Sequence, residues 1–213
     1  MSEFNIKNLK DVVGDITGVF HIGSHVGAEI IDYVSNGVEN ITWVEANYLI
    51  LNKLIKNTAS YGKNQMWLPY CLHDIDDQLR SFNISNNEES SSLLEFGEDV
   101  GKYYPQIHYV NKISVLTKRL DTLVKLHTDI DWSKFNMLAT DCQGSDLDVL
   151  KGCGDLLHSP ALKIIKTEFN FGEMYKGNPS LGQISEYLLK FGFVPKFYFH
   201  CTGGWGDQYF IRG

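Results

Sequence analysis

The chain has 213 residues, of which 43% are hydrophobic, 13% aromatic and 21% charged, and its net charge is −7. These proportions exclude disordered and collagen-like chains, and the length is enough to bury a core without disulfides or metals. One domain spanning residues 1–213 is the default expectation. The acidic balance argues against a broad phosphate-binding face, so we expect no nucleic-acid partner.

Neither a membrane span nor a secretory signal is expected. No apolar run approaches ~18 residues, and the N-terminal segment MSEFNIKNLKDVV lacks an apolar core. The cysteines form no C-x-x-C pair and match no zinc spacing; they are Cys71, Cys142, Cys153 and Cys201. We expect a cytoplasmic protein, not inserted in a membrane, whose cysteines are reduced core residues.

Strand-like and helix-like segments alternate along the first part of the chain. Apolar runs at 18–22, 41–44 and 65–71 predict buried strands. Between these runs, apolar residues recur at helical spacing, at Ala28, Ile31, Val34, Leu51, Leu54 and Ile55. This β-α-β-α-β order predicts an α/β fold in which helices cover a parallel sheet.

The second part of the chain has the same alternation. Strands are predicted at 135–140 and 162–167, and a β-hairpin at 193–212 with a glycine-rich loop. Helical spacing follows the first two strands, at Leu147, Leu150, Leu157, Leu181, Ile184 and Leu188.

Residues 73–134 separate the two parts and are too many for a simple connection, so we interpret them as a substrate-side insertion. A strand is predicted near 106–117 and a helix near 120–126. The polar segment SNNEESSS at 85–92 predicts a surface loop, either a plain connector or a lid over the substrate.

A glycine turn follows the first predicted strand, with Gly23 and Gly27 on either side of His25. Glycines let the backbone approach a ligand, and the helix that follows offers free amides, although such glycines also occur for steric reasons alone. The spacing differs from G-x-G-x-x-G and lacks the lysine of a P-loop, which disfavours NAD and ATP.

Glu45 ends the second predicted strand, where an acid can accept both hydroxyls of a ribose; the alternative is an ordinary exposed glutamate. A glycine turn without phosphate chemistry, combined with a ribose-binding acid, suggests S-adenosylmethionine as cofactor. We expect Cys71 and Leu72 to border its adenine.

Asp141 and Glu168 each end a predicted strand. Ligands of parallel sheets bind at the carboxyl ends of the strands, so these carboxylates are candidates for a general base or for the ligands of a divalent metal. The alternative for Asp141 is that it caps the following helix.

Several segments match motifs that occur together in one family. The motif D-x-G-A-N/H-x-G corresponds to HIGSHVG at 21–27, and E-P-N to EAN at 45–47. The more specific K-x-D-x-Q-G-x-E-x-x-V-L-K-G corresponds to ATDCQGSDLDVLKG at 139–152. With Tyr175 and Gly177 after Glu168, the chain resembles the FkbM-type S-adenosylmethionine-dependent methyltransferases over residues 19–194.

The resemblance implies a class I methyltransferase (Rossmann-like) fold, a seven-stranded mainly parallel sheet with one antiparallel strand and helices on both faces. It implies O-methylation of a hydroxyl on a sugar, glycan or related small molecule. The expected catalytic residues are Asp141 and Glu168, which are also the metal ligands if a divalent metal is used. The expected cofactor contacts are Gly23, Ser24, His25, Gly27, Glu29, Glu45, Ala46, Cys71, Leu72 and Asp141. The expected acceptor contacts are Ser91, Ser92, Gln143 and Tyr175.

Two residues depart from the family pattern: His21 replaces its first acid and Ala139 replaces its lysine. The family acid helps to hold the methionine end of the cofactor, so we expect Asp141 or Glu29 to take its place. His21 also favours an alternative, a cofactor-binding module that has lost catalysis. A second alternative, a Rossmann-like oxidoreductase, is disfavoured by the glycine spacing.

Overall fold

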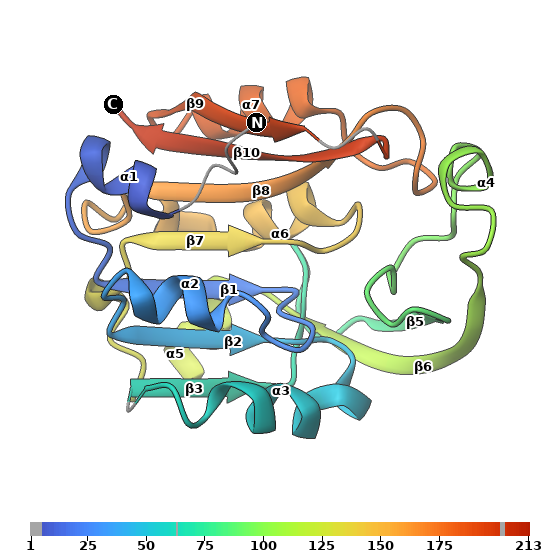
Figure 1. Ribbon diagram of the computed structural model, residues 1–213, viewed down its shortest axis with the longest axis horizontal. Coiled ribbons are helices and arrows are strands. Elements are labelled where there is room, and N and C mark those ends of the chain that lie inside the picture. Colours follow the sequence, from blue (N-terminus) through green and yellow to red (C-terminus); the bar gives the residue numbers. More distant parts are fainter. Residues whose placement is uncertain (1–5, 63, 201–202) are drawn as a thin grey trace.

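A seven-stranded sheet forms the centre of the molecule in a computed structural model that describes residues 6–62, 64–200 and 203–213 (Figure 1). The strand order is β3-β2-β1-β7-β8-β10-β9. Strand β10 runs antiparallel to both of its neighbours, β8 and β9, and the other neighbouring pairs are parallel. The strands are β1 (Gly18–Ile22), β2 (Asn40–Val44), β3 (Asn64–Leu68), β7 (Met137–Thr140), β8 (Ile164–Asn170), β9 (Phe193–His200) and β10 (Trp205–Arg212). The expected sheet is therefore confirmed, with the hairpin supplying the reversed strand; Cys201, in the expected hairpin loop, lies outside the described residues.

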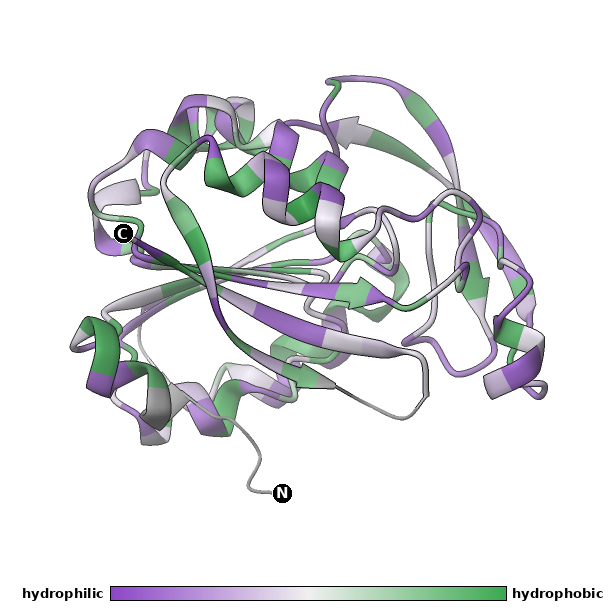
Figure 2. Ribbon diagram, turned by 90° about the horizontal axis from the view of Figure 1, so that it is seen from above, coloured by the Kyte–Doolittle hydropathy of each residue, from purple (hydrophilic) through white to green (hydrophobic). Residues whose placement is uncertain are grey.

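Helices cover both faces of this sheet, which Figure 2 shows from its edge. One face carries α1 (Ile6–Val13), α2 (Ile30–Ser35) and α3 (Leu51–Thr58), and the other carries α5 (Leu120–Leu126), α6 (Asp146–Gly152) and α7 (Leu181–Leu189). Successive side chains of β1 point to opposite faces of the sheet, so the strand contributes to the hydrophobic core on each face. Val19 packs with the first set of helices and Phe20 with the second. No helix in the described part of the chain is long and apolar enough to cross a membrane.

A second, three-stranded sheet lies beyond the carboxyl ends of the parallel strands (Figure 1). It has the order β4-β6-β5, with β4 (Cys71–Leu72), β5 (Leu79–Ser85) and β6 (Tyr109–Lys118), and the short helix α4 (Val100–Tyr103) lies between β5 and β6 in the chain. The strand predicted at 65–71 is therefore two strands: β3 ends at Leu68, and Cys71 pairs with Thr117 in the second sheet. The prediction missed β5, in which only three of seven residues are aliphatic or aromatic.

The serine-rich segment at 85–92 packs inward more than a surface loop would. Ser85, Ser91 and Ser92 are buried. The Ser91 hydroxyl donates to the Glu88 carbonyl at 2.6 Å, so the segment satisfies its own polar groups while it is buried. The middle of the segment is exposed, at Asn86, Asn87 and Glu89, as expected for a surface loop, whereas both of its ends are buried.

Other predicted boundaries shift where turns are longer than expected. Helix α2 begins at Ile30, after further turns, so Ile30 and Tyr33 are buried whereas Ile31 is 61% exposed. Strand β8 continues to Asn170, which places Glu168 inside the strand. The helix predicted through Leu157 ends at Gly152, and a 3-10 helix, η3 (Gly154–His158), follows it. Two further 3-10 helices are η1 (Tyr48–Ile50) and η2 (Trp132–Lys134).

Candidate active site

A cavity of about 460 Å³ lies at the carboxyl ends of β1, β2, β7 and β8, beneath the insertion. This volume is typical of a small-molecule site. The structure brings nearly all the predicted site residues to its wall: Gly23, Ser24, His25, Glu29, Glu45, Ala46, Cys71, Leu72, Ser91, Asp141, Gln143, Glu168 and Tyr175. Gly27 and Ser92 do not line it.

The glycine turn is fixed against β7 and α3. Gly23 has φ +76, and a Cβ there would lie 1.8 Å from the Asp141 carbonyl oxygen, so only glycine lets the two strand ends meet. Gly27 has φ +69, and a Cβ there would lie 2.4 Å from Thr58 Cγ2. The space beside Gly27 is filled by α3, which gives this glycine a packing role.

The Glu45 carboxylate holds the glycine turn at the end of β2. Its Oε2 accepts from the His25 backbone N–H and its Oε1 from that of Asn47, both at 2.7 Å. Burial raises the pKa of Glu45 despite these two donors. Each oxygen keeps a second lone pair, which suits a ligand with two adjacent hydroxyls.

His21 lies outside the cavity wall, on the face of β1 that α2 covers. Its Nδ1 is 3.0 Å from the Tyr33 hydroxyl, and its ring lies 5.4 Å from that of Trp43. Burial lowers the pKa of His21, and the nearby Glu29 partly offsets this. The replacement of the family acid therefore alters the core behind the cavity rather than its wall.

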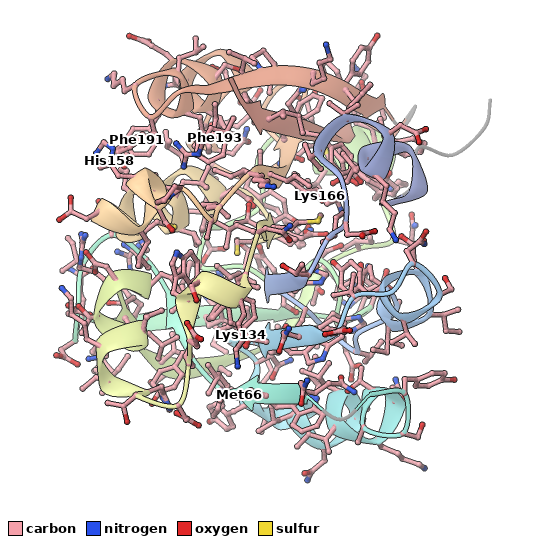
Figure 3. All side chains as sticks on the ribbon, turned by 90° about the vertical axis from the view of Figure 1, so that its left-hand side faces the viewer. Met66, Lys134, His158, Lys166, Phe191 and Phe193 are labelled. Carbon is pink, nitrogen blue, oxygen red and sulfur yellow. The ribbon has the colours of Figure 1, made fainter. Side chains whose placement is uncertain are left out.

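Glu29 is the acid that the cavity offers near the glycine turn. Burial raises the pKa of Glu29, but the neighbouring His21 and, to a smaller extent, Lys166 lower it, and the net shift is downward. Lys166 on β8 (Figure 3) is the neighbour in register of Ala139 on β7, so both lie on the same face of the sheet. The Lys166 ammonium forms an ion pair with the Asp207 carboxylate at 3.1 Å. Glu29 is therefore ionised at neutral pH.

Asp141 and Glu168 meet around one amide. Gln143 Nε2 donates to Asp141 Oδ1 at 2.6 Å and to Glu168 Oε2 at 3.1 Å. The Tyr175 hydroxyl donates to Gln143 Oε1, and the Ser92 hydroxyl donates to the Gln143 carbonyl at 2.8 Å. Ser92 therefore supports the site from outside the cavity. Asp141 is not the cap of α6, which begins after Ser145.

Two carboxyl groups at the site, Glu168 and Asp146, have raised pKa values. Burial, together with the neighbouring Asp141 and Asp146, raises the pKa of Glu168 well above its usual value. Burial and the nearby Asp141 also raise the pKa of Asp146 to about 7. Within the described ranges no group of three or more His, Cys, Asp or Glu side chains is arranged to hold a metal ion.

Sequence reasoning missed several cavity-lining residues on the insertion and after β8. Phe96, Tyr104, Asn170 and Met174 belong to irregular segments or strand ends, where no periodicity marks them. The sequence leaves two roles open for Trp205, stacking on a sugar or an adenine and packing in the core; Trp205 lines the cavity. One signal could have found these residues: large apolar side chains in predicted loops are usually buried against a partner or a ligand.

A smaller hollow of about 250 Å³ lies at the opposite ends of the strands, bordered by Met66 and Lys134 (Figure 3). None of the predicted site residues lines it. Ligands of parallel sheets bind at the carboxyl ends, which leaves the larger cavity as the candidate active site.

The sheet order, the glycine turn and the strand-end acids together define a class I S-adenosylmethionine-dependent methyltransferase. The methyltransferase FkbM domain matches residues 21–195, and the chain belongs to this family. A search of curated proteins finds no match.

Solved structures agree with the fold at low identity. A putative S-adenosylmethionine-dependent methyltransferase from Listeria monocytogenes has a TM-score of 0.53 and 8% identity, with 93% of this chain and 92% of that chain covered. TrmK from M. capricolum, in complex with S-adenosyl-homocysteine, has a TM-score of 0.51 and 10% identity, with 100% and 70% covered. At these identities the likeness shows the fold alone.

Proposed function

We propose that the protein transfers the methyl group of S-adenosylmethionine to a hydroxyl of a sugar, a glycan or a related small molecule. The observation that carries the proposal is the Asp141–Glu168 pair, held by Gln143 in the cavity wall. A hydroxyl is a weak nucleophile until a base takes its proton. A carboxylate held in this wall provides such a base.

The cavity wall fits the cofactor chemically. Glu45 would hold the ribose hydroxyls, Cys71 and Leu72 would border the adenine, and ionised Glu29 would accept from the methionine ammonium. Among the described lining residues there is no lysine or arginine, which suits a positively charged sulfonium and does not suit a pyrophosphate. When bound, S-adenosylmethionine supplies a methyl carbon that is already activated by its sulfonium.

This chain's residues then have three tasks. Asp141 accepts the proton of the acceptor hydroxyl as the bond to carbon forms. Burial and the neighbouring acids raise the pKa of Glu168, so we assign the base to Asp141 rather than to Glu168. Gln143 and Tyr175 fix the orientation of both carboxyl groups, and the insertion limits the access of water.

Two alternative functions are less well supported. A cofactor-binding module without catalysis was favoured by His21, but His21 lies behind the cavity and the carboxyl pair is intact. A Rossmann-like oxidoreductase is disfavoured by the glycine spacing, and the described lining residues include no lysine or arginine to pair with the phosphates of its cofactor.

The test is methyl transfer from isotopically labelled S-adenosylmethionine to a panel of glycosides and oligosaccharides, with mass spectrometry of the products. Label on an acceptor oxygen supports the proposal. Label on nitrogen or carbon across a broader panel overturns O-methylation. Tight binding of S-adenosylhomocysteine with no transfer to any acceptor favours the binding module instead.

A further inference from the structure

The cavity extends past Glu168 to an aromatic end formed by Phe96, Tyr104, Tyr175 and Trp205, which we call the aromatic subsite. The strand order places it on the far side from the glycine turn. Glu45 and Gly23 follow β2 and β1, whereas Tyr175 follows β8 and Trp205 begins β10. The start of β10 and the helix α4 both lie beyond the carboxyl ends of the parallel strands (Figure 1).

Contacts between distant segments hold these rings in place. Trp205 Nε1 donates to the Tyr104 hydroxyl at 3.1 Å, which joins the hairpin to the insertion. Phe96 stacks on Tyr109 with centroids 3.9 Å apart and lies 5.6 Å from Tyr175. A Cβ on Gly97 would lie 2.0 Å from the Glu173 carbonyl oxygen, so the insertion and the segment after β8 are in close contact. The subsite is therefore built before any ligand arrives.

The charged groups around the cavity are mostly acidic. The carboxyl groups that line it are those of Glu29, Glu45, Glu88, Glu89, Asp141 and Glu168. Among the described lining residues, the basic side chain is that of His25. Lys53 lies at the rim, but it is paired with Glu88 at 2.7 Å. Glu29 and Glu45 belong to the cofactor side, but an acceptor with a phosphate or carboxylate at the aromatic end would still lie near Asp141 without a guanidinium or ammonium partner among the described lining residues.

We propose that the aromatic subsite binds an uncharged sugar ring, whose apolar face stacks on Trp205 and its neighbours while one hydroxyl reaches Asp141. This inference rests on the proposed function and narrows it, because it excludes sugar phosphates, uronic acids and nucleic acid as acceptors. Aromatic side chains suit such a ring because they offer a flat apolar surface with a polar edge, here the phenol of Tyr104.

The experiment measures binding and turnover separately. The probes are neutral methyl hexopyranosides, the corresponding hexuronic acids and hexose 6-phosphates. Binding is followed by saturation-transfer NMR and calorimetry on protein loaded with S-adenosylhomocysteine, and turnover by methyl transfer from labelled S-adenosylmethionine. The variants are Trp205→Ala and Tyr104→Phe, with Tyr198→Ala as the control because Tyr198 is a 68% exposed aromatic on β9.

We expect neutral glycosides to bind the wild type at least tenfold more tightly than either charged class, since like charges repel strongly in a partly buried site. Trp205→Ala should weaken the neutral glycosides at least tenfold and Tyr104→Phe by a few-fold, while Tyr198→Ala changes nothing. S-adenosylhomocysteine affinity should stay unchanged in all three variants. If Trp205→Ala fails to fold, Trp205→Phe keeps a ring, loses the indole N–H, and should give an intermediate loss.

Equal binding of neutral and charged sugars would overturn the proposal, as would unchanged glycoside affinity in a folded Trp205→Ala. Absence of glycoside binding in the wild type would overturn it as well. Glycosides that bind but are not methylated would refute the proposed function and leave the subsite standing. Methylation of a hydroxyl on another kind of acceptor, without glycoside binding, would refute the subsite alone.

Discussion

Gln143 adopts a backbone conformation that is uncommon for a residue with a side chain, with φ +50. His25 and Glu88 share this feature, at φ +46 and +63, and all three line the cavity. Such strain persists where surrounding contacts enforce it. For Gln143 these contacts are the two carboxyl groups and the hydroxyls of Tyr175 and Ser92.

The first prediction concerns the carboxyl pair. Asp141→Asn and Glu168→Gln should each lower kcat by about 10²–10⁴-fold, because the base or the carboxyl group beside it is lost, with a smaller effect on cofactor affinity. Steady-state kinetics with calorimetry of S-adenosylhomocysteine measures both. Glu186→Gln, on the exposed face of α7, is the control. Near-normal kcat in both site variants would mean that catalysis rests on alignment alone.

The second prediction concerns metal. Asp141 and Glu168 already share the Gln143 amide donor, which engages one oxygen of each carboxyl group rather than leaving it to a metal ion. We expect EDTA to leave methyl transfer unchanged, as measured in the labelled-cofactor assay. Loss of activity that Mg²⁺ or Mn²⁺ restores would show that a cation takes part.

The third prediction concerns Glu45. Glu45→Ala should weaken S-adenosylmethionine binding roughly ten- to a hundredfold, since a charge-assisted hydrogen bond contributes ~1.5–3 kcal/mol. Glu45→Gln keeps one oxygen for the His25 or Asn47 backbone N–H and should fall between the wild type and alanine. Calorimetry measures the affinities, and a thermal melt shows whether the turn survives. Unchanged affinity in Glu45→Ala would refute the ribose assignment.

At the scale of elements, the sequence was informative where a segment contacts the core through a regular face. The buried parallel strands were located from their apolar runs. Helix α7 was located because Ile184 and Leu188 recur at helical spacing, and both are buried. The face of α2 was wrong because the turn before it shifts the helix by two residues, which exposes Ile31. Strand β5 was missed because its pairing with β6 depends on a partner about thirty residues later rather than on local alternation.

The fourth prediction compares two glycines that both have positive φ. Gly23→Ala places a Cβ 1.8 Å from the Asp141 carbonyl, whereas Gly14→Ala meets nothing within 4 Å. Both should lose about 1 kcal/mol to backbone strain, and Gly23→Ala about 2–4 kcal/mol more, because β1 and β7 must separate. Urea unfolding measures the difference. Equal losses would show that the turn and the end of β7 adjust freely.

At the scale of the whole molecule, Asp146 couples the stability of the fold to pH. It is buried in the first turn of α6 and accepts from the Cys142 backbone N–H at 3.2 Å. With a pKa of about 7 in the folded protein against 3.8 as the usual value, the folded state binds one more proton than the unfolded state between those pH values. The free energy of unfolding therefore falls as the pH rises from about 4 to about 7.

The fifth prediction is that Asp146→Asn flattens this decline, by up to about 4 kcal/mol over the interval. Asparagine keeps an oxygen for Cys142 and carries no charge at any of these pH values. Urea unfolding from pH 4 to 8 measures the slope, with the exposed Asp155→Asn as control. Parallel curves for the wild type and Asp146→Asn would show that Asp146 is ionised throughout.

The cofactor half of the cavity was predictable from sequence, and the acceptor half was not. Gly23, Glu45 and Asp141 follow strands whose order along the chain fixes their neighbours in space. Tyr104 and Trp205 meet only because the insertion folds toward the hairpin, across 101 residues of sequence. No local pattern encodes that contact, since it depends on the shape of two loops.

The placement of β10 between β8 and β9 has a consequence for biosynthesis. Strand β9 has β10 as its partner in the sheet, although β10 is made after it. During translation the first five parallel strands can assemble as they emerge, but β9 must wait until residues 205–212 have left the ribosome. Trp205 arrives with that strand, so a nascent chain can form the cavity wall around Gly23 and Glu45 before the wall that contains Trp205 is complete.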